Sequence, residues 1–111
     1  MTMLATVFAV SNLMLHGIDD LPPRASAEFL AMASIATDLC DDLKADSRTL
    51  AVLSDNLPGS FGQRRQIIEA AKGTFATAML GEPPATICAL LWDALGEDGE
   101  AIPGLLLRKE P

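Results

Sequence analysis

Apolar residues spaced alternately three and four positions apart form the clearest pattern in the chain. The run consists, in order, of Phe29, Met32, Ala36, Leu39, Leu43, Asp46, Leu50, Leu53 and Leu57. This heptad spacing places the side chains on one face of an α-helix. Pro22 and Pro23 favour a helix start just before the run, because a proline in the first turn loses no helical hydrogen bond. We therefore predict one long helix over residues 25–56.

Asp46 is the only polar residue in this stripe, and it has two interpretations. Aspartate favours helix caps, so Asp46 could mark a kink or a cap within the predicted helix. Alternatively, a polar group at a core position can fix the alignment of two packed helices. In that case Arg64, which falls on the equivalent stripe of the next helix, is the partner expected to neutralise the buried carboxylate. Both interpretations stay open at this stage.

Cap and turn residues delimit a second helix. Ser60 and Gln63 match the capping box, in which each side chain accepts a hydrogen bond from a free backbone N–H at the helix start. Gly81 predicts a left-handed stop, and Pro83 prevents continuation. The second helix is therefore expected to run from Ser60 to about Leu80.

A shorter third helix is predicted over residues 84–95, ending at Gly96. It is apolar on almost every side, which is typical of a helix buried in a core or an interface. At about 1.5 Å per residue, the second and third helices together match the length of the first. The expected fold is all-α, a single domain over residues 1–111 with three to four helices. One long heptad-patterned helix would pack against a broken antiparallel helical arm.

The first fifteen residues carry no charge. They fall short of the ~20 apolar residues that a membrane-spanning helix needs. We interpret residues 1–16 as a possible interface segment, either helix or strand. A secretory signal is the alternative, since residues 25–27 offer a small-x-small cleavage pattern, but no Lys or Arg precedes the apolar run as signals normally require. We therefore expect a cytoplasmic protein, with secretion as the lesser alternative.

Composition adds an expectation about assembly. Half of the 111 residues are hydrophobic, and the mean hydropathy is +0.28. A small domain has much surface to cover with polar groups, so this apolar content predicts that some apolar surface is buried against another chain or a membrane. A homodimer is the expected arrangement.

The net charge of −7 restricts the classes of partner. Binding to nucleic acid requires clustered Lys and Arg, and anionic membranes also repel acidic proteins. We expect neither direct nucleic-acid binding nor membrane association. Another protein, possibly a basic one, remains the expected partner.

No recognised catalytic, cofactor or metal motif stands in the sequence. It contains no nucleophile elbow, phosphate loop or dinucleotide-binding glycine fingerprint, and no zinc-ligand spacing. Cys40 and Cys88 lie in apolar helical contexts, where a cysteine usually packs as a small hydrophobe. A disulfide between them is possible in an oxidising compartment, although nothing in the pattern demands it. We expect a protein that is not an enzyme and uses no cofactor or metal.

These observations favour a non-enzymatic protein-interaction module, a homodimeric regulator or adaptor that binds another protein through helical faces. Large apolar side chains near the expected contact surfaces are the candidate interface residues: Phe8, Phe29, Ile87, Leu91, Trp92, Leu105 and Leu106. An acidic inhibitor that occupies the basic nucleic-acid-binding surface of a target is the first alternative. It requires Asp38, Asp41, Asp42 and Asp55 to form one continuous exposed face. A small secreted or membrane-associated protein is the second alternative.

Overall fold

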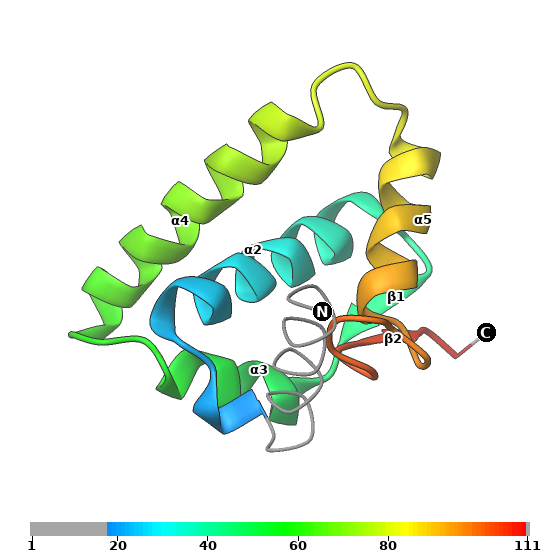
Figure 1. The fold of residues 1–111 in the computed structure, drawn as a ribbon. Coiled ribbons are helices and arrows are strands. Elements are labelled where there is room, and N and C mark those ends of the chain that lie inside the picture. The colour runs from blue at the N-terminus through cyan, green and yellow to red at the C-terminus, as the bar shows by residue number, and fades with distance from the viewer. Residues whose placement is uncertain (1–17, 111) are drawn as a thin grey trace, which may run out of the picture.

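A computed structural model describes residues 18–110, which form a mostly helical fold with one small sheet (Figure 1). In chain order the elements are the 3-10 helix η1 (Ile18–Asp20), α2 (Pro23–Leu39), β1 (Leu43–Ala45), α3 (Ser47–Asp55), α4 (Phe61–Ala78), α5 (Pro84–Leu95) and β2 (Leu106–Arg108). The all-α prediction is therefore confirmed at the level of fold class, with a two-stranded sheet in addition.

The predicted long helix over residues 25–56 is wrong. The chain leaves the helical conformation at Cys40, passes through β1 and starts a new helix at Ser47. Asp46 is the N-cap of α3, where its carboxylate accepts hydrogen bonds from the backbone N–H of Thr49 at 3.0 Å and from its hydroxyl at 2.6 Å. The cap interpretation of Asp46 is confirmed, because these bonds satisfy N–H groups that an uninterrupted helix would bond internally.

The predicted boundaries of the next two helices agree well with the structure. Both halves of the Ser60–Gln63 capping box form at the start of α4. Gly81 follows the helix with a φ of 88°, a left-handed conformation that suits glycine. The third helix, α5, spans Pro84–Leu95 as expected.

The arrangement of these helices differs from the predicted antiparallel arm. In Figure 1, α2 and α4 lie side by side and run in the same direction. Helix α3, which lies between them in sequence, runs back toward the start of α2. The end of α3 meets the start of α2, where the Asn56 side chain donates to the Ser26 hydroxyl at 3.0 Å. Because α3 already makes the reversal expected of α4, α4 runs parallel to α2.

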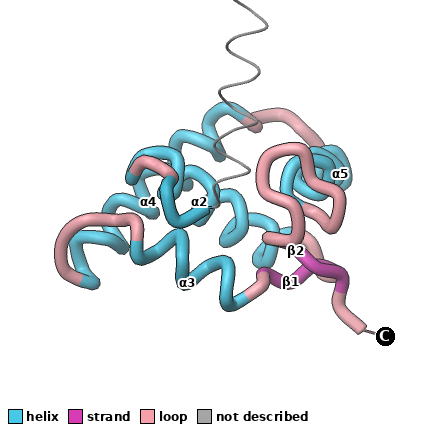
Figure 2. Tube along the Cα trace, turned by 60° about the horizontal axis from the view of Figure 1, so that its bottom comes forward, coloured by secondary structure: helices cyan, strands magenta, loops and turns pink. Residues whose placement is uncertain are grey.

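The two strands join distant parts of the chain. β1 pairs antiparallel with β2, with Leu43 opposite Arg108 and Ala45 opposite Leu106. Figure 2 shows the pair at the end of the molecule that carries α5. Buried side chains from α2, β1, α3, α5 and the last segment form the core, which comprises Ala27, Leu30, Ala33, Ala36, Cys40, Leu43, Leu53, Leu57, Leu91, Leu95, Ile102, Leu105 and Leu106.

A disulfide joins Cys40, at the end of α2, to Cys88 on α5, with their Cα atoms 5.9 Å apart. Of the two states that the sequence left open for these cysteines, the structure shows the disulfide. The two positions are 48 residues apart in sequence, and only the return of α5 onto the end of α2 brings them together. The bond fixes α5 against the core at the end opposite to the start of α2.

Candidate functional site

Helix α4 differs from the other α-helices of residues 18–110, each of which contains buried residues. None of its 18 residues, all within the described part of the chain, is buried. Ile67, Ile68, Ala71 and Phe75 pack against the core but stay partly open to solvent. A helix with an apolar face that remains half open is a candidate contact surface for another segment.

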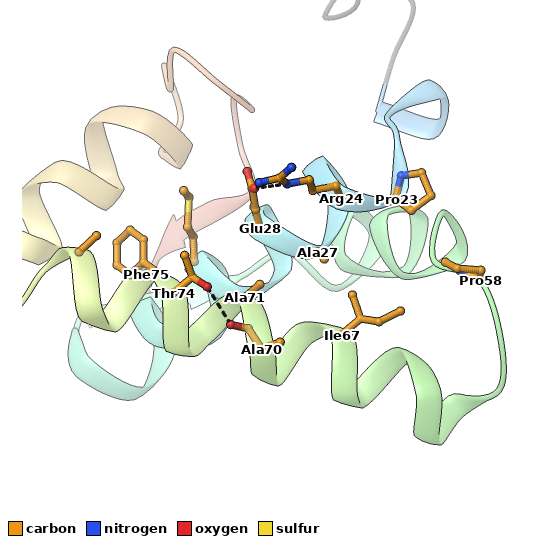
Figure 3. Close-up of a pocket in the computed structure, with 12 residues that line it drawn as sticks. Pro23, Arg24, Ala27, Glu28, Pro58, Ile67, Ala70, Ala71, Thr74 and Phe75 are labelled. Carbon is orange, nitrogen blue, oxygen red and sulfur yellow. Dashed lines mark hydrogen bonds and ion pairs between the residues drawn. The ribbon is translucent and has the colours of Figure 1, made fainter.

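An apolar groove of about 570 Å³ separates α4 from the first half of α2. Its walls are formed by residues from both helices and from the loop before α4: Pro23, Arg24, Ala27, Glu28, Met32, Pro58, Ile67, Ala70, Ala71, Thr74, Phe75 and Ala78. Figure 3 shows Pro23 and Pro58 at one end of this groove and Phe75 toward the other. The groove therefore follows the two parallel helices along their length.

Small side chains on α4 explain why the groove exists. Ala70, Ala71, Thr74 and Ala78 are four of the six α4 residues that line it, with the larger Ile67 and Phe75 as the other two. The four small side chains are too short to fill the space between the two helix backbones, and the space is left open in the described part of the chain.

The groove holds little charge and few free polar groups. Its two charged residues, Arg24 and Glu28, form an ion pair with each other at 3.5 Å. The Thr74 hydroxyl donates to the Ala70 carbonyl at 3.2 Å, as Figure 3 shows. A small polar substrate would find no convergent set of unpaired polar groups among these residues, whereas the apolar face of a helix would match the lining.

Three of the predicted interface residues belong to the core of the single chain. Leu91, Leu105 and Leu106 are buried, so they cannot contact a partner while the protein is folded. Two others, Phe29 and Ile87, are half-buried and pack against the same core. The proposed contact surface therefore differs from the one that apolar content alone indicated, and the predicted residue Phe8 lies outside the described residues together with the whole segment 1–16.

Trp92 also has protein neighbours. The Arg108 guanidinium lies 4.3 Å from the centre of its ring, and the same guanidinium forms an ion pair with Asp42. This cation–π contact covers one face of the half-buried indole. Trp92 therefore helps to hold β2 and α5 together within the chain.

The predicted registry pair of Asp46 and Arg64 does not form in the described structure. Asp46 caps the first turn of α3, whereas Arg64 lies near Ser54 in the last turn of that helix. About 12 Å of helix separates these two positions at ~1.5 Å per residue. The Arg64 Nε atom is buried and has no hydrogen-bond partner within residues 18–110.

The four acidic residues that the inhibitor alternative requires are all exposed, but they do not share one location. Asp55 precedes Asn56, whose side chain bonds to Ser26 near the start of α2. Asp38 lies near the other end of α2, about 18 Å further along the helix. Asp42 is paired with Arg108.

Two further properties concern the same described residues. Within residues 18–110, no three His, Cys, Asp or Glu side chains gather where they could hold a metal ion. None of the helices in that range combines the length and the apolar character that crossing a bilayer requires.

The groove was not predicted from the sequence, although its signal was present. The small residues at positions 70, 71, 74 and 78 indicated a helix face on which Phe75 is the one large side chain, and only the parallel placement of α2 turns that face into a cavity wall. Comparisons with protein-family models, with curated proteins and with solved structures found no match. The function proposed below therefore rests on the physical features of this chain.

Proposed function

We propose that this protein is a non-enzymatic interaction module that binds an apolar helix of another protein in the groove between α2 and α4. The observation that carries the proposal is an apolar groove along a helix that has no buried residue of its own. Amphipathic helices commonly bind in this way, with residues three and four positions apart inserted between two helices of the receptor.

The chemistry of the partner follows from the lining. Arg24 and Glu28 are paired with each other in solvent, with side chains 93% and 54% exposed, and the rest of the lining is uncharged, so a charged side chain buried on the bound face would lack a partner there. The bound face of the partner helix is therefore uncharged. In this proposal the protein is the regulator or adaptor, and its target is a protein that presents such a helix. The chain as a whole carries a net charge of −7, so a partner with a basic surface would associate faster.

A photochemical cross-linking experiment tests the groove directly. The full-length protein carrying Thr74→p-benzoylphenylalanine is produced in its host and illuminated, and adducts with other proteins are identified by mass spectrometry. We expect an adduct through an apolar helical segment of a different protein. Ala70→Glu places a charge in the groove and should abolish this adduct.

Ala76→Glu is the matched control. Ala76 is an exposed alanine of the same helix that does not line the groove, so the same added charge there should leave the adduct unchanged. Equal adduct yields from the two glutamate variants would contradict the proposal, as would adducts only to a second copy of this chain.

We further propose that the protein is a homodimer. Leu80 and Leu90 are 78% and 50% exposed, and neither lines the groove, so both leave apolar surface that a second copy could cover. Light scattering over an approximately hundredfold dilution should give twice the chain mass of 11.7 kDa. Leu90→Ser should shift the protein toward the monomer, and a wild-type protein that is monomeric at every concentration would refute the dimer.

A further inference from the structure

We propose that, in the free protein, the chain's own residues 2–15 occupy the groove between α2 and α4. The inference rests on the proposed function, because both require the groove to accept an apolar segment. It adds that a partner helix must displace a segment of the same chain.

The described chain begins beside one end of the groove. The Ile18 carbonyl accepts a hydrogen bond from the Asn56 side chain at 2.8 Å. Asn56 stands two residues before Pro58, which together with Pro23 lines one end of the groove. In Figure 3, the chain enters α2 beside Pro23 at this same end. The residues that precede Ile18 are therefore attached next to an opening of the groove.

The length of residues 2–15 matches the length of the groove. As a helix, residues 2–15 would extend for about 21 Å at ~1.5 Å per residue. The wall that α4 contributes, from Ile67 to Ala78, extends for about 17 Å by the same rise. A segment of this length fills the groove from its attached end with little excess.

The side chains of the segment also match the apolar lining of the groove. Residues 1–15 contain no charged side chain, in a chain where about a fifth of the residues are charged. Met3, Val7, Val10 and Met14 follow one another at helical spacing, which gives one continuous apolar face. An uncharged face of flexible methionine and branched valine side chains suits a lining in which the two charges are already paired.

The short connection to Ile18 favours occupation of the groove by the segment of the same chain over that of a second copy. Few residues separate the segment from Ile18, so its local concentration at the groove is in the millimolar range expected for short tethers. A second copy at micromolar concentration would compete poorly with it. The attached segment should therefore lower the apparent affinity of the groove for any partner.

The test uses purified full-length protein carrying Thr74→p-benzoylphenylalanine, with no other protein present. Equal amounts of ¹⁵N-labelled and unlabelled chains are mixed, illuminated and digested. We expect cross-links from position 74 to peptides within residues 2–15, with both ends from the same isotopic population. Cross-links that join labelled to unlabelled chains, or that avoid residues 2–15, would overturn the inference.

Two charge variants within the segment keep the test independent of folding. Val7→Asp places a charge on the apolar face and should reduce the cross-link at least about tenfold. Asn12→Asp adds the same charge on the opposite face of the helix and should leave the yield unchanged. If Val7→Asp has no effect, the segment does not bind through this face and the inference fails.

The outcomes separate this inference from the proposed function. If the purified protein gives no internal cross-link but the adduct in the host still distinguishes Ala70→Glu from Ala76→Glu, only the inference about residues 2–15 is wrong. If the internal cross-link forms but no partner adduct does, the proposed function is wrong and the groove serves the chain's own packing.

Discussion

Removing the disulfide with Cys40→Ala and Cys88→Ala should lower the stability of the protein substantially. The bond closes a loop between positions 48 residues apart. In the chain-entropy relation, a loop of this length lowers the entropy of the unfolded chain by about 14 cal/mol/K, or about 4 kcal/mol at room temperature. With an unfolding entropy near 2.1 cal/mol/K per residue, the melting temperature should fall by roughly 17 °C.

Circular dichroism during heating measures this change, with the wild-type protein in a strong reductant as the control. Reduction removes the cross-link but keeps both sulfur atoms, so the reduced wild type and the double variant should melt within a few degrees of each other. If the double variant and the oxidised wild type have the same melting temperature, the cross-link does not constrain the unfolded chain and the reasoning is refuted. A large loss in the double variant alone would assign the effect to packing around the buried Cys40.

The disulfide also bears on the cellular compartment. Cytosolic glutathione keeps most thiols reduced, so a structural disulfide of this kind is typical of an oxidising compartment. The absence of Lys or Arg before the apolar N-terminal run led to the opposite prediction, a cytoplasmic protein. Titration of free thiols in denatured protein taken rapidly from the host tests that prediction: two free thiols would support the cytoplasm, and none would support an oxidising compartment.

Four further substitutions test the fold. Leu43→Ala should cost about 2–4 kcal/mol in urea unfolding, because Leu43 is 2% exposed, whereas Leu39→Ala, at 36% exposure, should cost under about 1 kcal/mol. Asp46→Ala should cost about 1 kcal/mol at neutral pH through loss of the α3 cap. The cap's hydrogen bonds hold the pKa of Asp46 below its ordinary value of 3.8, so this cost should be constant above that pH. It should shrink as the pH falls through the lower pKa of the folded protein, as urea unfolding at several pH values would reveal. Gly96→Ala would place a Cβ atom 2.6 Å from the Trp92 carbonyl oxygen. The melting temperature of this variant should therefore fall clearly below that of the wild type. Equal melting temperatures of the two proteins would mean that the end of α5 can shift.

Local signals in the sequence predicted the parts of the fold that depend on neighbouring residues. The capping box at Ser60 and the glycine stop at Gly81 each act within a few residues, and both were read correctly. The prediction of one long helix was wrong because it relied on local spacing where distant contacts decide the structure. Heptad spacing continued through Leu39 and Leu43, although the helix ends at Leu39 and contacts with distant segments draw Cys40 and Leu43 into the core. The polar Asp46 within the stripe was the local sign that a new helix starts there.

Long-range contacts account for what the sequence did not reveal. The three-residue strand β1 is defined by its pairing with β2 more than sixty residues later, and neither strand has a pattern long enough to be recognised alone. Leu105 and Leu106 were predicted to meet a partner because the apolar content of the chain exceeds what a narrow helical hairpin can cover. The strand pairing returns them to the core. The groove depends in the same way on the parallel placement of α2 and α4.

The half-open packing of α4 has a consequence for how the protein unfolds. The helix contributes no fully buried residue, and it lies between Gly59 and Gly81, both of which adopt positive φ angles. Separating α4 from the remainder uncovers the half-buried Ile67, Ile68 and Phe75, while α2, α3, α5 and the strands keep their shared core of fully buried side chains. In native-state hydrogen exchange, the amides of α4 should exchange through a local opening of low free energy, whereas those around Leu53 and Leu95 should exchange only when the whole domain opens. The domain would then behave as two cooperative units, a stable one cross-linked by the disulfide and a second, single-helix unit that opens and closes many times before the first unfolds once.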